Sequence, residues 1–226
     1  MTAESHVVAA RTHGRYFVRA PRGEAGGILV GFHGYLENAE KHLGDLESIP
    51  GLDAWALVAV DALHAFYGSR SGSGRVVRGW MTRDLRAEAI ADNVDYVRGV
   101  VESARARFGW PLPVTMLGYS QGASMAWRAA VLAGHEVAAA IALAGDLPPE
   151  LAALPSEVPF PRRALLARGE ADDWYTAEKL ELDRARLVPR GLEVETLTFA
   201  GGHEWTDDFR AAAGALLGRV ASRAAD

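Results

Sequence analysis

The chain has 226 residues, 49% of them hydrophobic, which is enough for one large core and short for two, so we expect a single domain over residues 1–226. Its formal net charge of −5 argues against a nucleic-acid partner, and the absence of cysteine excludes disulfides and thiolate chemistry. The sequence starts without a signal-peptide pattern and contains no apolar run long enough to insert into a membrane, so we expect a cytoplasmic protein.

Apolar runs alternate with helical periods along the chain, a pattern typical of a mostly parallel sheet with helices on both faces. At the start we predict a hairpin, in which residues 7–11 and 15–18 pair around His13-Gly14. The other predicted strands are 28–32, 55–60, 114–117, 137–143, 163–167 and 192–199.

Helical periods separate these strands. A long helix is predicted at about 87–107, a second helix follows at 123–133, and an apolar stripe from Phe209 to Val220 predicts a closing helix. Between residues 60 and 90 the period is lost in the glycine-rich run 68–74, which predicts a flexible polar loop.

Ser120 lies between two glycines in Gly118-Tyr-Ser-Gln-Gly122, after an apolar run and before a helical pattern. This context is typical of a nucleophile elbow, a sharp strand-to-helix turn in which small neighbours relieve a crowded backbone. The following helix would begin beside Ser120, so we expect the amide of Gln121 to stabilise an oxyanion on a substrate carbonyl. An ordinary tight turn between strand and helix is the alternative, and the partners described next favour a serine hydrolase.

A serine hydroxyl needs an imidazole to take its proton and a carboxylate to orient that imidazole. In chain order the carboxylate comes after the strand that follows the next helix, and the histidine comes after the last strand. Only His203 occupies that last position. Three acids follow the strand 163–167. We choose Asp172, with Asp173 as the alternative, and interpret Glu170 as a solvated turn residue.

The second oxyanion donor is expected in the loop after the strand 28–32, where the His33-Gly34 pair would let the Tyr35 amide approach the nucleophile. We expect His33 to brace this loop rather than to transfer protons. The other histidines, His42, His64 and His135, are interpreted as ordinary surface or loop residues, although His64 could line the cleft.

Substrate contacts are expected from loops at the carboxyl ends of the strands. Trp80, Leu147 and Trp174 are the candidate lining of an apolar acyl or alcohol pocket, and packing of these side chains against the core is about equally plausible. The proline-rich segment 144–162 is too short for a sizeable helical cap, so Ser120 should be open to solvent.

Arginines in the glycine-rich loop form a second candidate set: Arg70, Arg75 and Arg78. They could attract an acidic substrate, but a solvated loop is the preferred interpretation. No dinucleotide fingerprint, phosphate loop or His-Glu-x-x-His motif is present, so we expect no cofactor and no metal.

These motifs resemble a family, the lid-poor carboxylesterases of the phospholipase/carboxylesterase and acyl-protein thioesterase group. The resembling segments follow the family's order along most of the chain: 32–34, 118–123, 143–148, 169–172 and 201–204. The resemblance implies an α/β-hydrolase fold with a mostly parallel, twisted sheet of about seven to eight strands and no large cap. It also implies hydrolysis of carboxylic esters or thioesters of small acyl substrates by Ser120, His203 and Asp172.

The chain departs from the family pattern in two places. Leu36-Glu37 replaces the usual Gly-Asp of the oxyanion loop, and Trp80-Met81-Thr82 replaces a Trp-Phe-Asp segment. Both departures bear on substrate choice rather than on the chemistry. A small serine peptidase or an acyltransferase would use the same triad, and a catalytically silent hydrolase fold could serve as a binding module.

Overall fold

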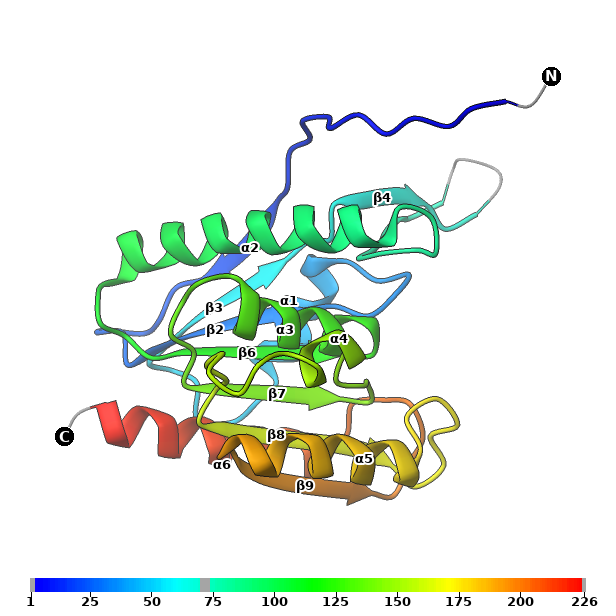
Figure 1. The fold of residues 1–226 in the computed structure, drawn as a ribbon. Helices are drawn as coiled ribbons and strands as arrows, with labels where there is room; N and C mark the ends of the chain where they lie inside the picture. The colour runs from blue at the N-terminus through cyan, green and yellow to red at the C-terminus, as the bar shows by residue number, and fades with distance from the viewer. Residues whose placement is uncertain (1–2, 70–73, 225–226) are drawn as a thin grey trace.

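The computed structural model describes residues 3–69 and 74–224, which are built around a seven-stranded sheet (Figure 1). In spatial order its strands are β1 (Tyr16–Arg19), β3 (Trp55–Val60), β2 (Gly27–Phe32), β6 (Val114–Tyr119), β7 (Ala139–Leu143), β8 (Arg163–Gly169) and β9 (Glu193–Phe199). Only β1 pairs antiparallel with its neighbour, and every other pairing in this sheet is parallel. The mostly parallel sheet predicted from the sequence is confirmed.

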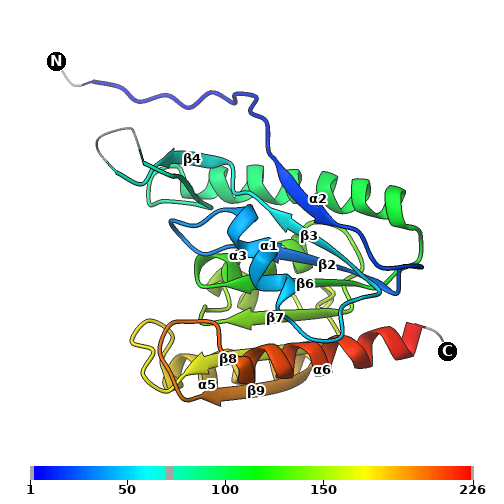
Figure 2. The same cartoon turned by 180° about the vertical axis from the view of Figure 1, so that it is seen from behind.

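Helices cover both faces of the sheet (Figures 1 and 2). One face packs against α2 (Arg86–Phe108), α3 (Gln121–Leu132) and α5 (Ala177–Leu187), and the other against α1 (Ala39–Glu47) and α6 (Asp207–Ala224). The connection from β7 to β8 holds only the four-residue helix α4 (Pro149–Ala152), so no sizeable cap is inserted there. A 3₁₀ turn, Val188–Arg190, follows α5.

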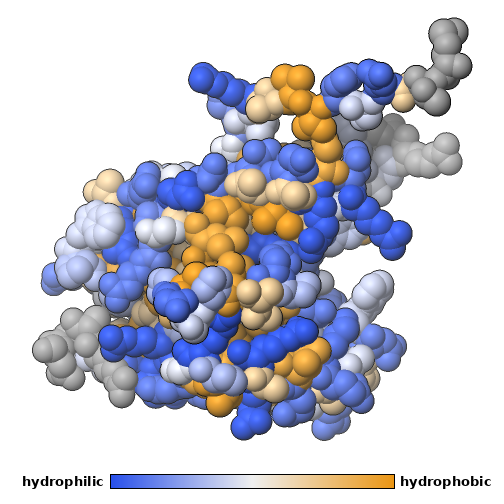
Figure 3. All heavy atoms as spheres, viewed as in Figure 1, coloured by the Kyte–Doolittle hydropathy of each residue, from blue (hydrophilic) through white to orange (hydrophobic). Residues whose placement is uncertain are grey.

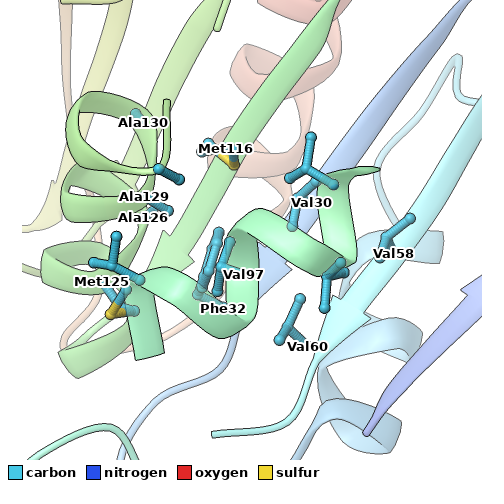
Figure 4. Packing of buried hydrophobic residues seen from close by; sticks show 14 of the residues in the cluster. Val30, Phe32, Val58, Val60, Val97, Met116, Met125, Ala126, Ala129 and Ala130 are labelled. Atoms are coloured by element: carbon cyan, nitrogen blue, oxygen red, sulfur yellow. The ribbon is translucent and has the colours of Figure 1, made fainter. Parts of the chain in front are cut away.

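Side chains of the central strands alternate between the two helical layers. On β2, Val30 and Phe32 pack toward α2 and α3, whereas Leu29 packs toward α1 and α6. Figure 4 shows Val30 and Phe32 beside Val97 of α2 and Met125 of α3. Burial of each such side chain contributes about 1.5–3 kcal/mol to the stability of the fold. Packing in the two apolar layers thereby fixes the positions at which the strands end.

The predicted N-terminal hairpin is wrong. Residues 3–15 form no strand, and Val8 in this segment is 85% exposed. Residues 16–19 form β1, which pairs with β3 and not with the preceding residues, since Tyr16 lies opposite Val60. Pairing with β3 makes β1 part of a seven-stranded sheet, whereas an isolated two-stranded hairpin is only marginally stable in water.

The polar loop predicted between residues 60 and 90 also differs from the structure. It contains a two-stranded antiparallel ribbon of β4 (His64–Tyr67) and β5 (Val76–Gly79). A strand without a buried face gives a weak sequence signal, and every residue of β4 is exposed. The predicted glycine-rich run lies partly outside the described residues, which omit 70–73.

The surface in the view of Figure 3 is mostly hydrophilic, with a smaller apolar area near its middle. Within residues 3–69 and 74–224, no helix has the length and apolar character needed to span a lipid bilayer. The seven strands share one sheet, and the single domain expected over residues 1–226 stays a prediction.

Leu57 tests the contribution of the buried layers, because its side chain is fully buried on β3. The Leu57→Ala variant should lower the free energy of unfolding by about 2–5 kcal/mol, since it leaves a cavity that neighbours fill only in part. Leu182→Ala on α5, where the side chain is 49% exposed, is the control and should change stability by less than about 0.5 kcal/mol. Urea denaturation followed by circular dichroism measures both, and equal losses would contradict the packing described.

Candidate active site

Ser120 occupies the sharp turn between β6 and α3, with φ of 55° and ψ of −122°. Such a conformation costs a non-glycine residue about 1–3 kcal/mol. A Cβ atom on Gly118 would lie 2.2 Å from the carbonyl oxygen of Gly122, and one on Gly122 would lie 2.1 Å from the carbonyl oxygen of Phe32. Both positions therefore require glycine, as expected for a nucleophile elbow.

A line of hydrogen bonds joins Ser120, His203 and Asp172. The Oγ atom of Ser120 lies 2.8 Å from Nε2 of His203, and Nδ1 of the same ring lies 3.0 Å from Oδ2 of Asp172. The Oδ1 atom of Asp172 accepts hydrogen bonds from the amides of Trp174 at 2.8 Å and Tyr175 at 3.0 Å. With Nδ1–H donating to Asp172, Nε2 is free to accept the proton of the serine hydroxyl.

The three acids after β8 have different surroundings. The side chain of Asp172 is fully buried against His203, whereas Asp173 and Glu170 are exposed. The structure thus brings Asp172, and neither of its acidic neighbours, to the histidine. Glu170 lies in the exposed turn, as its sequence context indicated.

The loops that carry Asp172 and His203 pack backbone against backbone. A Cβ atom on Gly169 would lie 2.2 Å from the carbonyl oxygen of Gly202, and Gly201 adopts a φ of 142°. The amide of Ala171 donates to the carbonyl of Gly201 at 2.9 Å. Gly201 and Gly202 allow the loop that carries His203 to bend over the end of β8. The turn that carries Asp172 begins at this end.

Tyr119 also contacts His203. Its hydroxyl donates to the backbone carbonyl of His203 at 2.6 Å, and the two rings lie 5.2 Å apart. Burial and the nearby carboxylate of Glu37 raise the pKa of the Tyr119 hydroxyl, so it stays protonated and acts as a donor. Sequence analysis missed this contact, because the elbow motif fixes Ser120 but says nothing of the hydroxyl beside it.

The amides of Gln121 and Tyr35, the two expected oxyanion donors, have no hydrogen-bond acceptor among the residues that the structure describes. Gln121 is the first residue of α3, so its amide has no acceptor within the helix. Tyr35 lies in the turn after β2, and its amide donates to no other group among the residues that the structure describes. Leu36, which follows it, adopts a φ of 65°.

His33 braces the oxyanion loop, as predicted. Its ring is fully buried, and burial lowers its pKa, so the imidazole stays neutral. The amide of Ala62 donates to Nε2 at 3.1 Å, which leaves Nδ1–H to donate to the carbonyl of Gly34 at 2.7 Å. The indole of Trp80 donates to the carbonyl of His33 at 2.8 Å.

Two of the three predicted pocket residues do not line the site. Trp80 is fully buried against Phe32 and His33, and Leu147 is 2% exposed in the core. Trp80 has a polar group that needs a buried acceptor, and the carbonyl of His33 supplies it. Trp174, in contrast, is 75% exposed and lies at the pocket.

The pocket beside Ser120 has a volume of about 250 Å³. It is open to solvent, as the short connection between β7 and β8 predicted. Its lining includes Ser120 and His203 together with three residues that sequence analysis did not identify: Ser124, Asp146 and Lys179. The side chain of Gln121 does not contribute to substrate chemistry here, since it bonds to the backbone of Trp80 and Met81.

The predictions for the remaining histidines have mixed outcomes. His64 is exposed, and Nε2 of His135 lies 3.1 Å from the carbonyl oxygen of Arg98. The prediction of a surface position is wrong for His42, which is fully buried on α1 against Trp205 because this helix packs onto the sheet.

Of the arginines expected in a solvated loop, Arg75 is exposed, whereas Arg78 turns inward. Arg78 forms an ion pair with the buried carboxylate of Asp61 at 3.1 Å, and Arg75 donates to Asn38. Arg70 lies outside the described residues. A buried carboxylate requires a cationic partner, which explains why Arg78 is drawn inward.

One group of side chains in the described part of the chain has the spacing of a metal site: Glu37, His42 and Asp45. The ammonium of Lys41 already lies 2.8 Å from a carboxylate oxygen of each of the two acids. A cation is therefore present between the carboxylates without a metal.

Comparison with known proteins identifies the fold. No family model matches the sequence, and no curated protein matches it significantly. Among solved structures, esterase PE8 is similar over 92% of this chain and 98% of its own, with 23% identity and a TM-score of 0.71. Acyl-protein thioesterase 2 of Zea mays matches 92% of this chain and 100% of its own at 20% identity, with a TM-score of 0.69.

A carboxylesterase of Bacillus cereus matches 92% of this chain and 94% of its own, with 15% identity and a TM-score of 0.72. The chain has the α/β-hydrolase fold. The resemblance to the phospholipase/carboxylesterase and acyl-protein thioesterase group, drawn from the motifs, is thus confirmed at the level of the fold.

Tyr119 provides a test of the geometry around His203. The Tyr119→Phe variant keeps the ring but leaves the carbonyl of His203 without its donor, at a cost of about 1–3 kcal/mol in stability. We expect kcat for an activated ester to fall by about tenfold with KM nearly unchanged, because the histidine is less well oriented. Tyr67→Phe, at an exposed tyrosine of the ribbon, is the control. Unchanged kcat in Tyr119→Phe would show that this hydrogen bond does not position His203.

Proposed function

We propose that the chain is a serine carboxylesterase that hydrolyses carboxylic esters or thioesters of small acyl substrates. The observation that carries this proposal is the unbroken line of hydrogen bonds from Ser120 through His203 to the buried Asp172. The strained backbone at Ser120 and the unpaired amides of Gln121 and Tyr35 support the same chemistry.

The first half of the proposed reaction forms an acyl-enzyme. The Oγ atom of Ser120 attacks the ester carbonyl carbon while its proton passes to Nε2 of His203. The amides of Tyr35 and Gln121 donate to the negative oxygen of the tetrahedral intermediate. The bond to the alcohol oxygen then breaks, and His203 gives its proton to that oxygen as the alcohol leaves.

The second half releases the acid. A water molecule attacks the acyl carbon, its proton passes to Nε2 of His203, and a second tetrahedral intermediate forms. When this collapses, the bond to Ser120 breaks and the proton returns to Oγ. Asp172 stays ionised throughout, because it stabilises the imidazolium and fixes its orientation.

Ser120→Ala should lower kcat by roughly 10³-fold or more while the fold is kept, because no acyl-enzyme can form. The measurement is a panel of p-nitrophenyl esters from acetate to palmitate, run beside acyl-thioesters and an aminoacyl amide. Ser222→Ala, at an exposed serine of α6, is the control and should retain full activity. Near-full esterase activity in a folded Ser120→Ala variant would contradict the proposed nucleophile.

The acids after β8 provide a second test. Asp172→Asn should lower kcat by up to about 10⁴-fold, because the amide cannot accept at both former oxygens and the histidine loses its preferred tautomer. Asp173→Asn should stay active, since that side chain is exposed. Both variants are compared by steady-state kinetics and circular dichroism, and the reverse outcome would assign the triad carboxylate to Asp173.

A further inference from the structure

The pocket beside Ser120 has a charged wall. Lys179 on α5 and Asp146 on the loop after β7 both line it, and the ammonium lies 3.3 Å from the carboxylate of Asp146. The same ammonium donates to the carbonyl of Trp174. Both side chains remain nearly half exposed, with 45% for Lys179 and 48% for Asp146. An exposed ion pair of this kind is weak, so a substrate anion can take the place of Asp146 beside the ammonium.

Two backbone amides lie in the same wall. Among residues 3–69 and 74–224, the amides of Gly145 and Asp146 donate to no protein acceptor, and both residues line the pocket. Gly145 lies against the elbow, since a Cβ atom there would be 2.3 Å from the carbonyl oxygen of Ser120. Unpaired amides and an ammonium are the donors that bind carboxylates in proteins.

The pocket also limits the size of its ligand. Its volume of about 250 Å³ is below that of pockets that hold drug-sized molecules. Trp80 and Leu147 were expected to make the pocket apolar together with Trp174. Both are buried instead, Trp80 beside His33 and Leu147 in the core. A long acyl chain therefore has little apolar surface to pack against in this pocket, whereas a short polar chain can accept hydrogen bonds from its wall.

We propose that this pocket binds a carboxylate carried by the substrate within a short chain of the scissile ester, with Lys179 and the adjacent amides as its donors. This inference rests on the proposed esterase function and names its substrate class. The preferred substrates are short monoesters in which a carboxylate lies on either the acyl or the alcohol side.

The test compares esters that differ in one anionic group. Monoethyl succinate and ethyl butyrate have acyl chains of equal length, and O-acetylglycolate and ethyl acetate form the matching pair on the alcohol side. Ester cleavage is followed by pH-stat titration at neutral pH. The variants are Lys179→Gln, Asp146→Asn and, as the control, Arg184→Gln, which removes a half-exposed charge from the same helix.

Lys179→Gln should lower kcat/KM for the anionic member of at least one pair by about tenfold and leave the neutral member within about twofold. Asp146→Asn should raise kcat/KM for that same anionic ester, because the ammonium loses its competing partner. Arg184→Gln should leave both members unchanged. Equal effects of Lys179→Gln on charged and neutral esters, or no effect on either, would overturn the proposal.

A binding measurement separates this inference from the esterase function. Succinate titrated into the wild-type protein in a calorimeter should bind, and Lys179→Gln should weaken that binding by about tenfold. If the protein cleaves none of the esters but binds succinate through Lys179, the esterase proposal fails and the carboxylate site stands. If it cleaves neutral esters and binds no succinate, the carboxylate site fails and the esterase proposal stands.

Discussion

The hydrogen bonds between Ser120, His203 and Asp172 require three loops, separated along the chain, to meet within the reach of one imidazole ring. The parallel sheet makes this possible, because β6, β8 and β9 all end at the same edge and each is followed by one of these loops. The apolar layers on the two faces then fix where each strand ends. The proposed catalytic geometry thus depends on burial far from Ser120.

Close backbone contacts then bring these loops within hydrogen-bonding distance of one another. Gly122 allows α3 to begin against the end of β2, and Gly169 allows the histidine loop to lie on the end of β8. Tyr119 and His33 add polar contacts that fix the carbonyl of His203 and the oxyanion loop. The strain at Ser120 is offset by these surroundings, including the bond from its own amide to the carbonyl of Leu143.

Features that depend on residues close together in the sequence were predictable. The strand 55–60 was predicted with its observed bounds because it is apolar throughout, and the elbow was predictable because only glycine fits on either side of Ser120. Asp172 was preferred over Asp173 on loop position alone. The structure now distinguishes them by burial.

Features decided by partners distant in sequence were not predictable. Trp80 has the composition of a pocket residue, but its indole donates to a carbonyl 47 positions earlier in the chain. The segment 7–11 is mostly apolar, yet it forms no strand, and β1 pairs instead with β3, which lies farther along the chain. Lys179 gave no sequence signal, because its relation to Asp146 arises only when α5 packs onto the sheet.

Covalent labelling tests the central claim most directly. An exposed serine activated by a neutral imidazole reacts with a fluorophosphonate, and peptide mass spectrometry identifies the residue that carries the phosphonyl group. We expect the label on Ser120 in the wild-type protein and its loss when His203 is replaced by alanine with the fold intact. Absence of labelling, or labelling at another serine, would contradict a nucleophile at the turn between β6 and α3.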